Sequence, residues 1–183
     1  MLLKGDSMAT INSTQPDNNN FLSPIGFQFA IQKIPNVNYF VTAANIPDIS
    51  LGQIDTVDNT FIKLPVPGDK LSFGLLNIRF NVDEDLRNYR EIYDWLIGLG
   101  FPDNFQQRGT LSTGTGIQQD GVYSDATLIA TTAAYKPNIR VNFVDVYPVN
   151  LSTLEFDVQG TDVEYLTATV SFAYRKFELD TIV

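Results

Sequence analysis

The chain has 183 residues, of which 44% are hydrophobic and 18% are charged, and this composition excludes a chain that is disordered throughout. It contains neither cysteine nor histidine, which excludes disulfides, cysteine nucleophiles, the serine–histidine triad and nearly all zinc sites. The 12 basic residues against 21 acidic ones give a net charge of −9, the wrong sign for a protein that wraps nucleic acid.

The length suits one domain, preceded by a polar arm. Residues 1–23 have little apolar content and form the predicted arm, and residues 24–183 form the predicted domain. Within it, residues 101–123 are rich in glycine, serine, threonine and glutamine and are predicted to be a long loop. No apolar run approaches the roughly 20 residues that span a bilayer, so we expect no membrane segment.

Most of the domain has the pattern of β-structure. In Phe27–Ile31, apolar and polar side chains alternate with the period of a half-buried strand. Residues 48–66 are expected to form an extended excursion, followed by a turn at Pro65, Pro67 and Gly68. The other predicted strands are Tyr39–Ala43, Lys70–Val82, Ala126–Thr132, Asn138–Tyr147 and Glu164–Phe177. Pro148 is expected to end the strand before it, and Leu151–Leu154 to form a short turn.

One helix is predicted between Leu86 and Leu99, because the hydrophobic period changes there from two to about 3.6. The acidic run Asp83–Asp85 suits the positive end of the helix dipole, and Gly98 and Gly100 are expected to stop the helix. Five aromatic residues on this helix and on the last strand are the predicted anchors of the fold. They are Tyr89, Tyr93, Trp95, Phe172 and Tyr174.

The order of elements predicts an α+β fold that is mainly antiparallel β, a sandwich or open barrel with one flanking helix. Two of the predicted strands, Lys70–Val82 and Glu164–Phe177, are about twice the usual length and carry few of the residues that protect a strand edge. We therefore expect the β-ladder to continue into another subunit.

Carboxylates are the only plausible catalytic groups in this chain, and they are weak evidence for an enzyme. Three pairs, Asp83/Asp85, Glu155/Asp157 and Asp162/Glu164, have the spacing that could place two carboxylates on one face of a strand. Acids that cap a helix or lie in solvated loops explain each pair better. We expect no enzyme activity, no catalytic residues, no metal site and no cofactor.

Three exposed aromatic residues flank the long loop: Phe101, Phe105 and Tyr123. They either pack under that loop or anchor a neighbouring molecule, and the sequence leaves both interpretations open.

Several segments together resemble a known family. They are Gly68–Phe73, Ile78–Glu84, Asn88–Arg90, Asp94–Leu96 and Thr169–Arg175, with Ala44–Pro47 at the end of an early strand. Their order over about residues 25–178 resembles the tail tube proteins of contractile-tailed bacteriophages, including the junction proteins that start the tube on the baseplate.

The resemblance implies a virion structural protein, in which six copies close a ring and rings stack into a tube that conducts DNA. It implies that the excursion Ile46–Pro67 reaches the next ring, and that the arm and the 101–123 loop contact neighbours or the sheath. The contact residues expected from it are Ile46, Pro47, Ile49, Leu51, Phe61, Leu64, Phe101, Phe105 and Tyr123.

The implied partners are further copies of the chain, tail sheath proteins and baseplate proteins, with DNA passing through without specific binding. The implied location is the phage tail of the virion, after assembly in the host cytoplasm. Within the family we favour the repeating tube subunit over a baseplate initiator or a ring at the tube end.

A rival interpretation from another class is a carbohydrate-binding β-sandwich. It requires a cluster of exposed aromatic residues beside acids, and the nearest candidates, Tyr123, Tyr135 and Tyr147, are scattered along the chain. A glycosidase that uses Asp83 or Asp157 ranks third.

Overall fold

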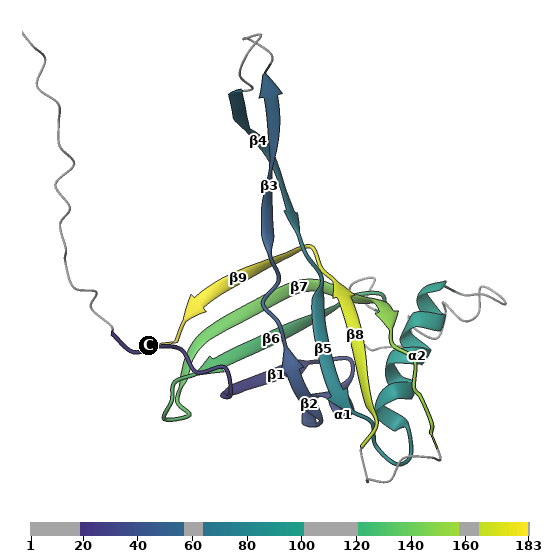
Figure 1. Ribbon diagram of the computed structural model, residues 1–183. Helices are drawn as coiled ribbons and strands as arrows, with labels where there is room; N and C mark the ends of the chain where they lie inside the picture. The colour runs from purple at the N-terminus through teal and green to yellow at the C-terminus, as the bar shows by residue number, and fades with distance from the viewer. Residues whose placement is uncertain (1–18, 57–63, 101–120, 158–164, 183) are drawn as a thin grey trace, which may run out of the picture.

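The computed structural model describes residues 19–56, 64–100, 121–157 and 165–182. Within these ranges the chain forms a curved antiparallel sheet, two helices beside it and a two-stranded hairpin that projects from the body (Figure 1). The α+β fold class, mainly antiparallel β, is confirmed.

The elements follow one another along the chain in the order of their numbers. The strands are β1 (Phe27–Ile31), β2 (Val41–Ala44), β3 (Ile49–Thr56), β4 (Leu64–Phe73), β5 (Leu76–Asn81), β6 (Ser124–Thr131), β7 (Pro137–Leu151), β8 (Thr167–Ala173) and β9 (Lys176–Thr181). The helices are α1 (Pro35–Tyr39) and α2 (Arg87–Gly100).

Strand β7 joins two halves of the main sheet, whose order is β1-β6-β7-β8-β5-β2 with β9 also paired to β7. Its first part pairs with β6 and β9, and its last part pairs with β8. We call β1, β6, β9 and the first part of β7 the first half-sheet. The second half-sheet consists of β2, β5, β8 and the last part of β7.

The hydrophobic core lies between the two half-sheets and α2. Phe143 comes from the first half-sheet, Phe80 and Phe172 come from the second, and all three are almost fully buried. Trp95 of α2 packs on Phe172 with ring centroids 6.1 Å apart. The helix thus closes one side of the sheet.

The other aromatic anchors differ in burial. The Tyr89 hydroxyl donates a hydrogen bond to the Ser152 carbonyl at 3.2 Å, and Tyr174 belongs to an aromatic group with Phe73, Phe143 and Phe177. Tyr93 is 50% exposed and lies outside the core.

The start of α2 depends on a buried side chain. Asn88 is fully buried, donates from Nδ2 to the Asn81 carbonyl at 2.8 Å, and accepts a hydrogen bond from the Asp83 amide at 3.3 Å. The Asp83 carboxylate in turn accepts from the Asn88 amide. Asp83 therefore joins β5 to α2 as a polar cap, in keeping with the predicted role of the acidic run.

The predicted single strand Lys70–Val82 is wrong, because the chain changes partner in its middle. Strand β4 pairs with β3 in the hairpin, whereas β5 pairs with β2 and β8 in the main sheet. The change occurs at Gly74, whose amide donates to the Asp48 carbonyl at 3.0 Å. An added Cβ there would meet the Asp48 side chain, which would have to move away.

The predicted strand Glu164–Phe177 is also wrong in its length. Two shorter strands, β8 and β9, follow β7 one after the other. They are separated at Arg175, whose side chain pairs with Asp145 at 3.0 Å, and Asp145 has a positive φ of 57°. Strand β7 thus pairs with β9 before Asp145 and with β8 after it.

Three prolines that were expected to form a turn or to end a strand lie within strands. Pro65 and Pro67 lie within β4, not in a turn, because a ribbon of two strands leaves one side of each strand without a ladder. Pro148 does not end β7, since the register shifts between Pro148 and Asn150 and the strand continues to Leu151.

The first helix was not predicted, and an expected turn is absent. Pro35 begins α1 where Tyr39–Ala43 was expected to be a strand, and the strand starts only at Val41. The expected short turn at Leu151–Leu154 is extended chain, in which the Ser152 hydroxyl accepts from the Thr169 amide at 2.9 Å.

Candidate functional site

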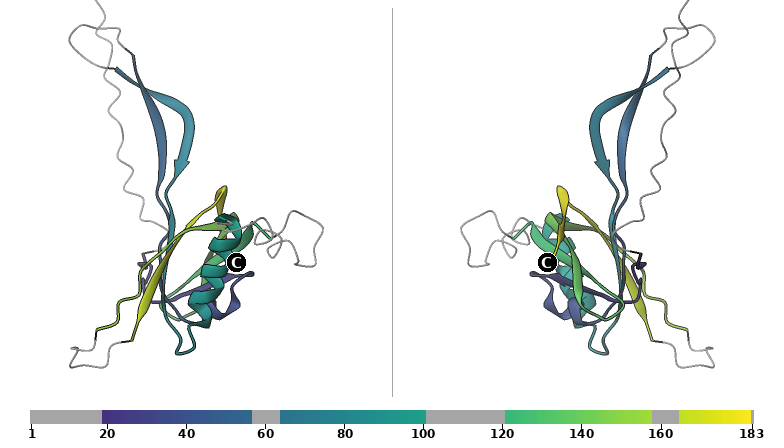
Figure 2. Two further views of the ribbon diagram at one scale, coloured as in Figure 1. Left: turned by 90° about the vertical axis from the view of Figure 1, so that its right-hand side faces the viewer. Right: turned by 90° about the vertical axis from the view of Figure 1, so that its left-hand side faces the viewer.

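The hairpin β3–β4 exposes an unusual amount of apolar surface. It stands away from the body of the molecule in all three views (Figure 2). The exposed apolar side chains on it and at its base each keep between 44% and 60% of their surface accessible. They are Ile46, Ile49, Leu51, Ile54, Val66, Leu71 and Leu75. Such a concentration of exposed aliphatic residues is typical of an interaction surface.

The faces of the hairpin are fixed by its register. Ile49 pairs with Phe73 and Leu51 with Leu71 on one face, while Ser50 and Ser72 hydrogen-bond to each other at 2.7 Å on the opposite face. The pairing shifts between Leu51 and Gln53. The hairpin thus presents an apolar side over its lower part and a polar side behind it.

The base of the hairpin is held by aromatic packing. Phe73, the last residue of β4, packs against Tyr174 and Phe177 with ring centroids 6.0 and 5.7 Å away. Both of these rings also contact Phe143 of the core. The contacts of Phe73 with Tyr174 and Phe177 therefore help to orient the hairpin relative to the main sheet.

The residues predicted to make contacts fall into three groups. Ile46, Ile49 and Leu51 are exposed at or near the base of the hairpin, whereas Pro47 is buried within the chain. Leu64 is the first residue of β4. Phe61, Phe101 and Phe105 lie outside the described residues. Sequence reasoning missed Ile54, Val66, Leu71 and Leu75, because the sequence pattern does not distinguish exposed apolar residues from core residues.

Tyr123 lies directly before β6 and is 49% exposed. Its ring packs edge-on against Tyr147 at 5.7 Å, while Tyr135 lies on the turn between β6 and β7 with 74% of its surface exposed. Two of the three tyrosines of the carbohydrate hypothesis thus contact each other.

A second surface is the face of the second half-sheet that points away from the core. Leu76, Ile78 and Phe80 of β5 are buried, so the alternating residues point to the opposite face. This face is polar and is formed by Asn77, Arg79, Asn81, Thr167, Thr169 and Ser171. We call these six residues the polar face.

The free edge of β1 is partly protected. The Asn38 side chain of α1 accepts from the Ile31 amide at 3.0 Å and donates to the Ile31 carbonyl at 3.1 Å, as a neighbouring strand would. Antiparallel alternation leaves the amides and carbonyls of Phe27 and Phe29 pointing to the same open side. This edge has room for a further strand only over those residues.

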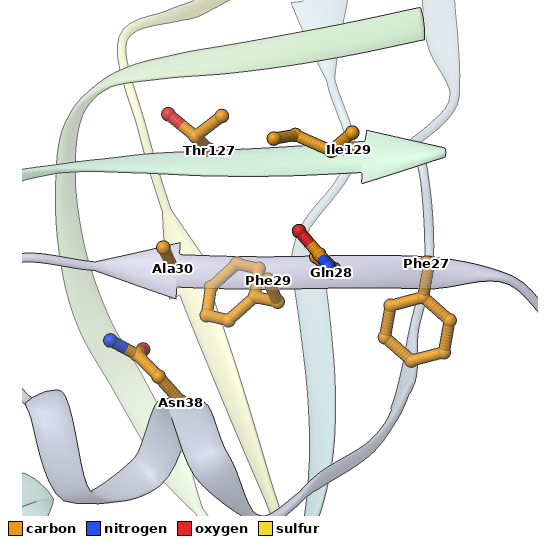
Figure 3. A pocket seen from close by; sticks show the side chains of 7 residues that line it. All are labelled: Phe27, Gln28, Phe29, Ala30, Asn38, Thr127 and Ile129. Atoms are coloured by element: carbon orange, nitrogen blue, oxygen red, sulfur yellow. The ribbon is translucent and has the colours of Figure 1, made fainter. Parts of the chain in front are cut away.

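A hollow of about 350 Å³ lies beside this edge (Figure 3). Its lining is Phe27, Gln28, Phe29, Ala30, Asn38, Thr127 and Ile129. These side chains supply amides, one hydroxyl and apolar surface, without any ionisable group, so the hollow offers no acid–base chemistry.

The backbone of Gly121 and Val122, shortly before β6, is hydrogen-bonded to Lys33 and Trp95. The Lys33 ammonium donates to the Gly121 carbonyl and lies 4.6 Å from the centre of the Trp95 ring. Trp95 donates from Nε1 to the Val122 carbonyl at 3.1 Å. Burial lowers the pKa of Lys33 from its usual 10.5 to about 8.

Two of the carboxylates considered for catalysis, Asp83 and Asp85, have structural contacts. Asp83 caps α2, and Asp85 pairs with Arg87 at 3.0 Å. Asp162 and Glu164 lie outside the described residues. No helix within the described ranges is long and apolar enough to cross a membrane.

Comparison with known proteins links this arrangement to contractile tails. No family model matches the chain. The chain is 25% identical over 137 residues to the tail tube terminator protein of Enterobacteria phage T4, a match that covers 74% of this chain and 73% of that protein. In sequence, the chain is thus similar to the tail tube-related proteins of contractile tails.

Solved structures of contractile injection systems share the fold. The cap that terminates the tube of the anti-feeding prophage superposes with a TM-score of 0.62 at 15% identity, covering 95% of this chain and all of that one. The sheath/tube terminator of an extracellular injection system, PVC, superposes with a TM-score of 0.59 at 18% identity, covering 89% and 99%. The PVC sheath–tube complex gives 0.57 at 16% identity, covering 90% and 94%.

The predicted family is thereby confirmed. The chain is similar in sequence to a phage tail tube terminator and shares its fold with tube proteins of contractile injection systems.

Proposed function

We propose that this protein forms the ring that ends the tail tube of a contractile phage. The observation that carries the proposal is its identity of 25% to the T4 tail tube terminator across 73% of that protein. The similarity of its fold to a tube-terminating cap and to a sheath/tube terminator supports the same position. This is the tube-end alternative of the sequence analysis rather than the repeating subunit that we favoured there.

The exposed apolar hairpin supports assembly with further copies. Aliphatic side chains such as Ile54 and Leu71 gain about 25 cal/mol for each Å² removed from water, so a neighbour that covers the hairpin is favoured. Contacts between different patches on identical subunits close into a ring when the rotation between copies allows it. The family resemblance predicts six copies in that ring.

The position at the tube end defines the other proposed partners. One side of the ring meets the last ring of the tube, and its rim meets the sheath, in line with the relatives found in sheath–tube structures. DNA passes through the centre during ejection. The arm and the 101–123 loop are proposed contacts to these neighbours, as are Ile46, Ile49, Leu51 and Tyr123.

The repeating tube subunit remains the second candidate, because the chain also shares its fold with a sheath–tube complex. Negative-stain electron microscopy of the purified full chain distinguishes the two. A terminator forms single rings or short stacks and binds one end of tubes made from the phage's own tube protein. Long tubes formed by this chain alone would exclude the terminator role.

The role of the hairpin is tested by one charged substitution. Ile54→Lys places an ammonium on the exposed apolar surface without touching the core, so we expect a folded protein that no longer forms rings in mass photometry. Ile25→Lys is the matched control, since Ile25 is 79% exposed and lies before β1, away from the hairpin. Rings of normal yield from Ile54→Lys would show that the hairpin is not a contact.

A further inference from the structure

The polar face is almost free of charge. Asn77 lies opposite Ser171, whose hydroxyl donates to the Asn77 side-chain oxygen at 2.7 Å. Arg79 lies opposite Thr169, and Asn81 lies opposite Thr167. Strands β2, β5 and β8 contain no aspartate, glutamate or lysine, and Arg79 is their single charged residue.

The outward face of the first half-sheet has the opposite character. Arg140 lies across from Asp180, and Asn142 lies across from Glu178 and donates to Asp180 at 3.0 Å. Lys176 continues the same row and pairs with Glu178. Charges of both signs therefore lie on the β7–β9 part of one outward face, while neutral amides and hydroxyls cover most of the other. The two faces are suited to different neighbours.

Arg79 lies in the middle of the polar face and is exposed. Some surface cations pair with carboxylates, as Arg87 does with Asp85 and Arg90 with Asp94. No described carboxylate pairs with Arg79. In a chain of net charge −9, an exposed guanidinium on a face without acids is free to bind an external anion.

We propose that the polar face lines the channel of the ring and that Arg79 contacts phosphates of DNA in that channel. This inference rests on the proposed ring. A guanidinium binds phosphate through paired N–H groups, and a closed ring repeats the contact once in each subunit. The surrounding Thr, Ser and Asn side chains add neither attraction nor repulsion, so DNA is contacted at one level and slides over the remainder.

The placement of the face is tested with single thiols, because the natural chain has no cysteine. Thr169 lies beside Arg79 on the polar face, and Thr169→Cys is the test variant. Thr127 lies on the outward face of the first half-sheet, and Thr127→Cys is the matched control. Each thiol is modified with a photoactivated cross-linker and irradiated with short duplex DNA and the assembled protein. We expect about tenfold more DNA adduct from Thr169→Cys than from Thr127→Cys, since charge-assisted contacts hold DNA at the Arg79 face.

The charge itself is tested by Arg79→Gln against Arg140→Gln, which removes an exposed arginine from the other face. At about 50 mM salt we expect Arg79→Gln to weaken duplex binding about tenfold and to make the dependence of log affinity on log salt less steep. The slope should fall by about 0.9 for each phosphate that is no longer neutralised. Arg140→Gln is expected to bind like the natural protein, and Arg79→Lys to retain most of the binding.

Two outcomes overturn this inference while leaving the ring intact. Equal affinity of Arg79→Gln and Arg140→Gln for duplex DNA would show that Arg79 does not contact phosphate. That result is expected if the channel conducts a protein instead of DNA. Protection of Thr169→Cys from maleimide in assembled rings would show that a second copy covers the face. Failure to form rings at all would instead contradict the proposed function, and the glutamine variants still test Arg79 on the monomer.

Discussion

Phe73 packs edge to face on Phe177, with ring centroids 5.7 Å apart and planes inclined by 65°. The contact joins the end of the hairpin to the start of β9, about a hundred residues later in the sequence. It means that the exposed hairpin is attached rigidly to the half-sheet that carries mixed charge. An assembly that uses the hairpin therefore also fixes the orientation of that half-sheet.

Replacing this ring should weaken assembly more than folding. Phe73→Ala removes a partly buried aromatic side chain and should cost about 2 kcal/mol of unfolding free energy, less than a fully buried phenylalanine. The main sheet keeps the packing of Phe143 on Phe177. We expect a folded chain with a lower ring yield, measured by urea unfolding and mass photometry. Phe156→Ala, at a ring that is 75% exposed, is the control and should change neither quantity.

The close approach of two glycines in the hairpin gives a second prediction. A Cβ added to Gly68 would lie 2.6 Å from the carbonyl oxygen of Gly52 and 2.9 Å from its carbon, so Gly68→Ala must separate β3 from β4 at this point. Hydrogen–deuterium exchange should become faster in both strands and remain unchanged in β8. Gly100→Ala is the matched control, because nothing lies within 4 Å of the added Cβ. Unchanged exchange in Gly68→Ala would contradict this packing.

The buried Asn88 should be among the most sensitive polar residues of the fold. Asn88→Ala leaves the Asn81 carbonyl without the Nδ2 donor and the Tyr89 and Asp83 amides without their acceptor, so we expect a loss of about 2 kcal/mol in chemical unfolding. Arg87→Ala, next to it, removes only an exposed ion pair with Asp85 and should cost less than about 0.5 kcal/mol. Similar losses in both variants would show that the Asn88 network is not important.

The parts of the fold that depend on local pattern were predictable. Strand β1 and helix α2 follow from the spacing of their own apolar residues, and both occur close to the predicted bounds. The partner of a strand is not encoded in that spacing. The apolar positions change phase between Phe73 and Leu76, but this shift alone does not show that the chain passes there from the hairpin to the main sheet.

Which apolar residues of the candidate surfaces are exposed could not be predicted from the sequence pattern. An aliphatic residue such as Ile54 in an alternating strand has the sequence signature of a core residue, and only the three-dimensional structure shows that nothing in the described chain covers it. The contrast between the polar face and the charged face was hidden for the same reason. It depends on which strands are neighbours, through pairs such as Arg79 with Thr169.

The pH dependence of stability gives the last prediction, through Lys33. Its pKa is lowered by burial to about 8 in the folded protein and has the ordinary value of 10.5 when unfolded. Between these values the unfolded chain binds more protons than the folded chain, so the unfolding free energy rises with pH across this window. Below pH 8 the Lys33 ammonium is held in its charged form in the folded protein, and the desolvation cost lowers the unfolding free energy by its full amount.

Lys33→Met keeps the apolar stem over Trp95 and removes the titrating group, so comparison of the two proteins isolates this contribution. Burial raises the pKa of Tyr174, and its titration near and above about pH 10 would act in the opposite direction, so the measurement stays below about pH 9.5. We expect the melting temperature of the natural protein to rise relative to that of Lys33→Met between about pH 7.5 and 9.5. Parallel melting curves across this range would show that Lys33 keeps its proton, held by the Gly121 carbonyl and the Trp95 ring.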